Sequence, residues 1–144
     1  GADIKRVLDA GAAGVQMGTR FAATQESSAG ERFKRLYVNA TPEGVVLIES
    51  PVGLPGRALQ NAFTRSLAEG GAQPIRTCIR CLKKCGQDFC IMDKLVRAQR
   101  DDDVDDGLVF AGSAAARITD IPTVAELMDR LVGEWRAASE GATG

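Results

Sequence analysis

The sequence has little that would attract a charged macromolecule or a membrane. Its 18 Lys and Arg residues are balanced by 19 Asp and Glu residues, so the net charge is -1 and no overall field recruits nucleic acid or an anionic membrane. No apolar run approaches the roughly 20 residues of a membrane-spanning helix, and no signal-peptide pattern is visible. We therefore expect a cytoplasmic protein that has neither nucleic acid nor a membrane as a partner.

Histidine is absent, and we assign no catalytic residue to this chain. The sequence also begins at Gly1 without an initiator Met and runs directly into an amphipathic helix that ends at Gly11. Its 144 residues suffice for one domain with a real core. We expect this sequence to be a fragment of a longer protein.

The most informative segment is residues 11–21, GAAGVQMGTRF. Residues 13–17 carry no charge, which is typical of a parallel strand covered on both faces. Gly18 lets a ligand approach the backbone closely, and Thr19 offers both an N–H group and a hydroxyl. A helix that begins near Arg20 would direct its positive N-terminus to the same place. The pattern predicts a phosphate-binding turn, although an ordinary strand-to-helix turn has the same local pattern.

All four cysteines fall within residues 78–90, as Cys78-x2-Cys81-x3-Cys85-x4-Cys90. Thiolates this close in sequence can converge on one ion, and tetrahedral sulfur coordination suits Zn²⁺ or an iron–sulfur cluster. A reducing cytosol disfavours disulfides. Alternatively, one or two of these residues are simply small buried apolar side chains. The spacing matches neither the usual ferredoxin pattern nor a paired zinc ribbon.

Capping signals predict three further helices. Ser28–Glu31 has the spacing of a capping box, and Asp88 is the expected cap of a helix whose apolar face is Ile91, Met92, Leu95 and Val96. A second capping box, Thr123–Glu126, begins a helix whose apolar residues recur at helical spacing. We assign this stripe to the core: Val124, Leu127, Met128, Leu131, Val132 and Trp135.

Residues 50–57 contain two prolines and two glycines and are expected to form a shaped loop. A helix is predicted from about Ala58 to Glu69. Short strands are predicted at Val45–Ile48 and, as a strand or an extended segment, at Gly107–Gly112. The acidic run at 101–106 is expected to be a solvated loop, because it lacks the Gly and the distal Glu of a calcium-binding EF-hand loop.

Several motifs in the same order resemble the nitronate monooxygenase family, formerly called 2-nitropropane dioxygenases. Residues 14–21 (GVQMGTRF) resemble the last barrel strand of the family, and residues 50–59 (SPVGLPGRAL), the cysteine segment and residues 107–112 (GLVFAG) are similar to one of its branches. The resemblance implies an α/β fold, the C-terminal part of a (β/α)8 TIM barrel with a mainly helical C-terminal extension. Residues 1–40 would be the last barrel units, 41–137 the extension and 138–144 a tail.

The resemblance also implies an FMN-dependent oxidoreductase whose small-molecule substrate, an alkyl nitronate, is oxidised with O₂ to a carbonyl compound and nitrite. In this chain, Gln16, Met17, Gly18 and Thr19 would help to hold the FMN phosphate. A complete barrel needs roughly 250 residues, so the N-terminal barrel strands and the catalytic His of many members would lie outside this chain.

Two other functions stay open. One is a flavin-dependent enoyl-acyl-carrier-protein reductase that uses NADH, and the other is a metal or electron-relay module built on the cysteines without flavin. Among single residues, we expect a rim salt bridge for Arg20. Arg57 is equally suited to such a bridge or to an anionic ligand. Residues 111–113 would either return toward the flavin or form a plain turn, and Tyr37 and Trp135 are expected to be packing residues.

Overall fold

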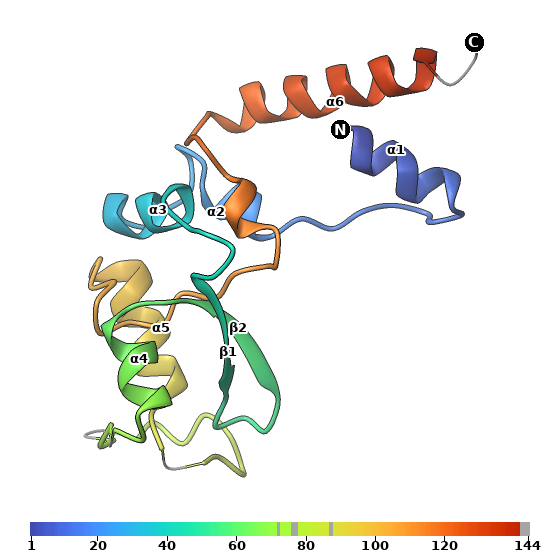
Figure 1. The fold of residues 1–144 in the computed structure, drawn as a ribbon. Coiled ribbons are helices and arrows are strands. Elements are labelled where there is room, and N and C mark those ends of the chain that lie inside the picture. Colours follow the sequence, from blue (N-terminus) through green and yellow to red (C-terminus); the bar gives the residue numbers. More distant parts are fainter. Residues whose placement is uncertain (72, 76–77, 87, 142–144) are drawn as a thin grey trace.

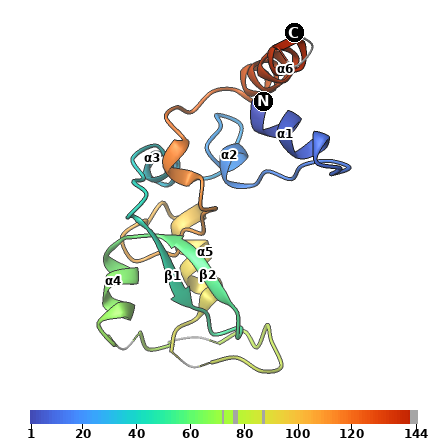
Figure 2. The same cartoon turned by 45° about the vertical axis from the view of Figure 1, so that its right-hand side comes forward.

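The computed structural model describes residues 1–71, 73–75, 78–86 and 88–141. The β1–β2 hairpin lies with α4 and α5 at one end of the molecule, α1 and α6 lie side by side at the other end, and α2 and α3 lie between (Figures 1 and 2). The elements are α1 (Ala2–Asp9), α2 (Thr19–Ala22), α3 (Glu31–Val38), β1 (Val45–Glu49), β2 (Pro55–Leu59), α4 (Ala62–Ala68), α5 (Ile91–Arg100), the 3₁₀ turn η1 (Ala115–Arg117) and α6 (Val124–Glu140). Within the described ranges no helix has the length and apolar character needed to cross a bilayer.

Strands β1 and β2 form an antiparallel hairpin in which Val45 lies opposite Leu59. The strand prediction at 45–48 is confirmed. The helix expected from about Ala58 to Glu69 is present, but its predicted start at Ala58 is wrong. Ala58 is fully buried, pairs with Val46 and forms a bridge to Phe110, so it lies between two extended neighbours. Hydrogen bonding and burial on both sides outweigh the weak helix propensity of this segment.

The helix that was expected there begins later, at α4, and Asn61 is its N-cap. The Asn61 side chain accepts a hydrogen bond from the Thr64 N–H, and the Thr64 hydroxyl accepts one from the Asn61 N–H, both at 2.9 Å. This reciprocal pair satisfies two N–H groups at the start of the helix.

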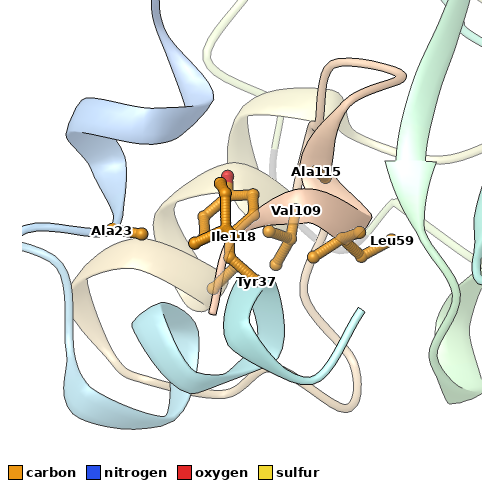
Figure 3. Close-up of a cluster of buried hydrophobic side chains, with 7 residues drawn as sticks. Ala23, Tyr37, Leu59, Val109, Ala115 and Ile118 are labelled. Atoms are coloured by element: carbon orange, nitrogen blue, oxygen red, sulfur yellow. The ribbon is translucent and has the colours of Figure 1, made fainter. Parts of the chain in front are cut away.

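The predicted extended segment at 107–112 is confirmed, and it lies beside β2 on the side opposite β1. The N–H of Leu59 donates to the Val109 carbonyl at 2.9 Å, and the N–H of Ala111 donates to the Arg57 carbonyl at 3.0 Å. Val109 also belongs to a buried apolar cluster that joins α3, β2, α5 and η1 (Figure 3). The cluster contains Ala23, Tyr37, Leu59, Ala98, Val109, Ala115 and Ile118. A second cluster on the other side of β2 contains Ile48, Ala58, Phe63, Phe89, Ile91 and Leu108.

The buried parallel strand expected at residues 13–17 is not found. This segment is extended but unpaired, and all of it except the half-buried Met17 is exposed. The only sheet among the described residues is the β1–β2 hairpin. A parallel strand needs neighbouring strands for its N–H and C=O groups, and none of the described segments lies beside it in that role.

The helix predicted after Ser28 is present as α3, but it begins at Glu31 and its expected cap is wrong. Its N-cap is Gly30, without a side-chain cap of its own. Instead, the Asp102 carboxylate accepts hydrogen bonds from the backbone N–H groups of Arg32 at 3.0 Å and Phe33 at 2.8 Å. A Cβ on Gly30 would collide with the Asp102 side chain. A distant carboxylate therefore caps this helix, and glycine leaves it room.

Helix α6 is confirmed, and so is its capping box, in which the Glu126 side chain accepts from the Thr123 N–H at 2.8 Å. The assignment of its whole apolar stripe to the core is wrong. Leu127 is buried, but Met128, Val132 and Trp135 are 45%, 39% and 39% exposed. In the described structure α6 packs mainly against α1, which covers only part of the stripe. The helix also includes residues 138–140, which we expected to be a tail.

The predicted apolar face of helix α5 is confirmed only in part. Its N-cap is Cys90 and not Asp88. Ile91 is buried and Leu95 packs against the second cluster as expected, whereas Met92 and Val96 are 39% and 36% exposed. The buried face instead contains Lys94 and Ala98. Lys94 is buried because its ammonium group finds polar partners inside, as described below.

Candidate functional site

The predicted cofactor residues lie at the start of α2. Gln16 and Gly18 are exposed, and Met17 and Thr19 are half-buried. Across the described part of the chain, the backbone N–H groups of Gly18 and Thr19 find no hydrogen-bond acceptor. Because α2 has four residues, its dipole is that of a single turn. Any anion held here would therefore be bound mainly by these N–H groups.

Thr19 joins this turn to the segment at 107–112. Its hydroxyl oxygen accepts a hydrogen bond from the Gly112 N–H at 2.9 Å. A hydroxyl has one proton to donate as well as its lone pairs. The bond from Gly112 thus leaves the Thr19 proton for a further acceptor, and it places residues 111–112 directly beside the predicted cofactor turn.

An open hollow of about 590 Å³ lies in front of this turn, lined by Gly18, Thr19, Ala22, Tyr37, Arg57, Phe110 and Ala111. The Arg57 side chain is exposed there, and no carboxylate among the described residues is within ion-pair distance of it. The hollow therefore combines backbone N–H donors, one cation and an aromatic wall. A larger hollow of about 820 Å³, between β1, α4 and Phe89, contains none of the predicted cofactor residues.

The aromatic wall is held by two close contacts. The Tyr37 hydroxyl donates a hydrogen bond to the Phe110 carbonyl at 2.6 Å, and burial raises the pKa of Tyr37 to about 12. Tyr37 is therefore a neutral donor near pH 7 and not a base. The Phe110 ring lies on Gly56, where a Cβ would come within 2.6 Å of it. We expected Tyr37 to be only a packing residue, and its place in this wall was not predicted.

Arg20 and Arg57 have different surroundings. The Arg20 guanidinium donates to the Asp120 carboxylate at 2.6 Å and to its carbonyl at 2.9 Å, so the predicted salt bridge is confirmed. Hydrogen bonding from Arg130 and the charge of Arg20 keep the pKa of Asp120 below its usual value. Arg20 is thus engaged in a structural salt bridge, whereas Arg57 is the cation that lines the hollow.

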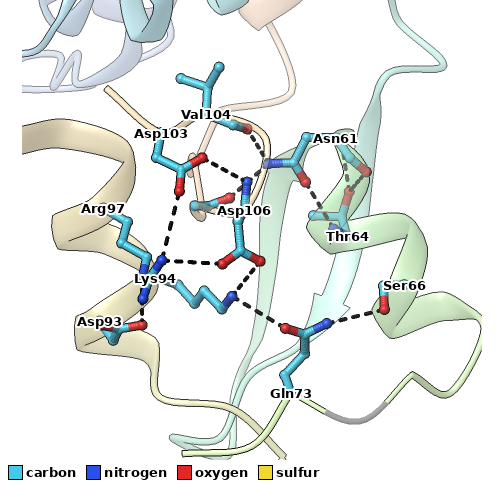
Figure 4. A network of polar contacts seen from close by, with 11 residues as sticks. Asn61, Thr64, Ser66, Gln73, Asp93, Lys94, Arg97, Asp103, Val104 and Asp106 are labelled. Atoms are coloured by element: carbon cyan, nitrogen blue, oxygen red, sulfur yellow. Dashed lines mark hydrogen bonds and ion pairs between the residues drawn. The ribbon is translucent and has the colours of Figure 1, made fainter. Parts of the chain in front are cut away.

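A polar network holds the acidic run in place (Figure 4). The Asn61 side-chain amide donates to the carbonyls of Val104 and Gly107, both at 2.7 Å. The Lys94 ammonium group donates to Asp106 at 2.7 Å and lies 4.5 Å from the centre of the Phe63 ring. The acidic run is therefore not the simple solvated loop that we expected. It anchors the segment that continues to Gly112 and the hollow.

The four cysteines lie on a coil between α4 and α5. Cys78 and Cys81 are exposed, Cys85 and Cys90 are half-buried, and no disulfide joins them. Burial, and then the proximity of Cys81, Cys78 and Cys90, raises the pKa of the Cys85 thiol. Nowhere in the described ranges do three or more potential ligands converge closely enough to hold a metal ion. The predicted metal site is therefore not preformed.

The chain is similar to known proteins in both sequence and structure. The sequence profile described as nitronate monooxygenase matches residues 1–134. A curated relative, the (3aS,4S,5R,7aS)-5-hydroxy-7a-methyl-1-oxo-octahydro-1H-indene-4-carboxyl-CoA dehydrogenase of Mycobacterium tuberculosis (strain ATCC 25618 / H37Rv), is 37% identical over 70 residues. That alignment covers 49% of this chain and 20% of the relative.

Similar solved structures include a mutant of FabK from Thermotoga maritima, with a TM-score of 0.75 and 25% identity over 98% of this chain and 40% of that one. FabK itself gives 0.76 and 24%, over 97% of this chain and 42% of that one. The nitroalkane oxidase from Streptomyces ansochromogenes gives 0.69 and 22%, over 98% and 38%. These neighbours are TIM-barrel proteins, and this chain spans about two fifths of their length, consistent with part of a barrel.

Proposed function

The chain belongs to the nitronate monooxygenase family, and from this premise we propose that it forms part of the site of an FMN-dependent oxidoreductase that acts on alkyl nitronates. FMN would supply the redox chemistry. The residues of this chain would hold the cofactor phosphate, through Gln16, Met17, Gly18 and Thr19, and orient the substrate. In the overall reaction two nitronates and one O₂ give two carbonyl compounds and two nitrites.

The observation that carries this proposal is the hollow shared by the turn at Gly18 and Thr19 with Arg57 and Phe110. Two N–H groups without acceptors suit a phosphate, as backbone donors do in other anion sites. The Arg57 guanidinium suits a planar anion with two oxygens, because it donates two parallel hydrogen bonds. A nitronate group is such an anion.

None of the side chains that line the hollow is a proton acceptor near neutral pH. A nitronate is already deprotonated at carbon, so its oxidation needs no base from this chain. The chain has no histidine, and Tyr37 keeps its proton up to a pH of about 12 while its hydroxyl donates to the Phe110 carbonyl. We therefore assign binding and orientation, and no proton abstraction, to these residues.

The phosphate assignment is tested by titrating the ¹⁵N-labelled chain with FMN and with riboflavin, which lacks the phosphate. The amide signals of Gly18 and Thr19 should shift with FMN and not with riboflavin. The Gly18→Ala variant should weaken this shift, because a Cβ there meets no described atom within 4 Å yet blocks close approach of a ligand.

Gly14→Ala is the matched control, since a Cβ at Gly14 also meets nothing within 4 Å and Gly14 does not line the hollow. It should leave the FMN response unchanged. Equal shifts with FMN and riboflavin, or a Gly18→Ala variant that responds to FMN as the parent chain does, would contradict the phosphate assignment.

A second candidate is an NADH-dependent enoyl-thioester reductase. It is favoured by the similarity to FabK and to a relative whose name specifies a carboxyl-CoA substrate. Anaerobic reduction of the flavin-loaded full-length enzyme separates the two activities. Loss of flavin absorbance with a nitronate alone supports the monooxygenase, whereas loss with NADH alone supports the reductase. If the nitronate reduces the flavin, Arg57→Gln should raise the nitronate concentration needed for half-maximal reduction. Arg57→Lys should raise it less, because lysine keeps the positive charge.

A further inference from the structure

The coil that carries the four cysteines is unusually long. No helix or strand is found between the end of α4 at Ala68 and the start of α5 at Ile91 in the residues that the structure describes. Loops longer than about 12–15 residues without secondary structure are uncommon in compact domains and usually have a function. Such a coil must be stabilised by interactions other than the backbone hydrogen bonds of helices and sheets.

The thiols lie within one part of this coil, and its first turn is already curled around a sulfur atom. The Arg80 N–H donates to Cys78 Sγ at 3.4 Å, and Arg80 has a left-handed φ of 54°. Cys81 is the residue that directly follows this turn. Cys85 and Cys90 follow on the same coil, and both are half-buried.

The charges around the coil also suit a group of thiolates. Arg80, Lys83 and Lys84 lie between the first three cysteines, and none of them has a carboxylate within ion-pair distance among the described residues. Four thiolates around one Zn²⁺ have a net charge of -2, which three nearby cations offset. The same cations would repel a metal ion bound without thiolates.

We propose that Cys78, Cys81, Cys85 and Cys90 bind one thiophilic metal centre, either Zn²⁺ or an iron–sulfur cluster. Both take tetrahedral thiolate ligands. Because the ligands have not converged in this structure, binding must draw the coil inward. The free energy of metal binding then becomes folding energy for this segment, as in other small metal-binding units. The proposal is independent of the flavin function.

The experiment is metal and sulfide analysis of the whole chain after anaerobic purification and again after reconstitution with Zn²⁺ or with iron and sulfide. We expect about one metal centre per chain, colourless for zinc or with visible absorption and acid-labile sulfide for iron. Cys85→Ser should reduce the metal content several-fold, because a hydroxyl is a poor ligand for a soft ion.

Leu82→Ser is the matched control, since Leu82 is 43% exposed on the same coil and changing it leaves every thiol in place. It should keep the metal content of the parent chain. Trypsin gives a second measurement, because Arg80, Lys83 and Lys84 are cleavage sites that a closed coil would protect. Four thiols that react equally fast before and after reconstitution, with only trace metal, would overturn the proposal. A Leu82→Ser variant that loses metal as Cys85→Ser does would overturn it too.

Discussion

The cap of α3 by Asp102 gives the sharpest test of how the chain is held together. In Asp102→Ala, the N–H groups of Arg32 and Phe33 lose their acceptor. Loss of a side-chain cap costs about 0.5–2 kcal/mol. Asp102 also has a left-handed φ of 53°, where alanine is strained by about 1 kcal/mol. We expect the free energy of unfolding to fall by about 1.5–3 kcal/mol, measured by urea denaturation followed by circular dichroism.

Companion variants separate the two contributions. Asp102→Gly removes the cap but tolerates the left-handed backbone, so it should be less destabilising than Asp102→Ala by about 1 kcal/mol. Asp102→Asn keeps one acceptor oxygen and should lose only about 1 kcal/mol. Asp101→Ala is the control, because in the described part of the chain the Asp101 carboxylate bonds only to its neighbour Arg100. The variant should change stability by less than about 0.5 kcal/mol. If Asp102→Ala and Asp101→Ala had equal effects, the capping explanation would be refuted.

Three further predictions concern the hollow. Tyr37 is the only tyrosine, so tyrosinate absorbance reports on it alone: it should titrate near pH 12 in the folded chain. Since an unfolded tyrosine ionises near pH 10, stability should fall by about 1.4 kcal/mol per pH unit from about pH 10 to pH 12, a loss that Tyr37→Phe should abolish. Gly56→Ala should destabilise the chain by about 1–3 kcal/mol, because the added Cβ would collide with the Phe110 ring. In the control Gly53→Ala, the added Cβ meets no described atom, so this variant has only the cost of its positive φ. Equal unfolding midpoints for Gly56→Ala and the parent would disprove the contact. The 144-residue chain alone should bind FMN weakly, with Kd about 1 mM or higher, since it would supply only part of the cradle; a micromolar Kd from calorimetry would disprove this.

Features set by near neighbours in the sequence could be predicted. The Thr123 capping box and the strand at 45–48 depend on residues within a few positions, and both are present. The capping box predicted at Ser28–Glu31 was wrong, because the group that caps this helix is distant in the sequence. The carboxylate that caps α3 lies about 70 residues away, and no local pattern identifies it. Spacing alone therefore found the helix but not the group that stabilises its start.

The strand at 55–59 shows a second limit. Pro55, Gly56 and Arg57 resemble a loop, and the residues after them resemble a helix. What makes them a strand is that β1 lies on one side and residues 109–111 on the other. A third limit appears at Lys94, which helical spacing places among polar residues. It is buried because Asp106 and the Phe63 ring, both distant in sequence, surround its ammonium group.

The candidate site combines both kinds of information. The turn at Gly18 and Thr19 was visible in the sequence, whereas its neighbours Tyr37, Arg57 and Phe110 come together only through the fold. The acidic run makes this possible: Asn61 and Lys94 hold it against α4 and α5, and the segment that leaves it reaches Thr19 through the Gly112 N–H. A residue far from the hollow can therefore affect the hollow. By this reasoning Asn61→Ala, which leaves the carbonyls of Val104 and Gly107 without their donor, should weaken the selective response of Thr19 to FMN as well as the fold. Asn61→Asp should weaken it as well, because it keeps the capping oxygen for Thr64 but also lacks the N–H donors. If Asn61→Asp responded to FMN as the parent chain does, the proposed connection from this network to Thr19 would be wrong.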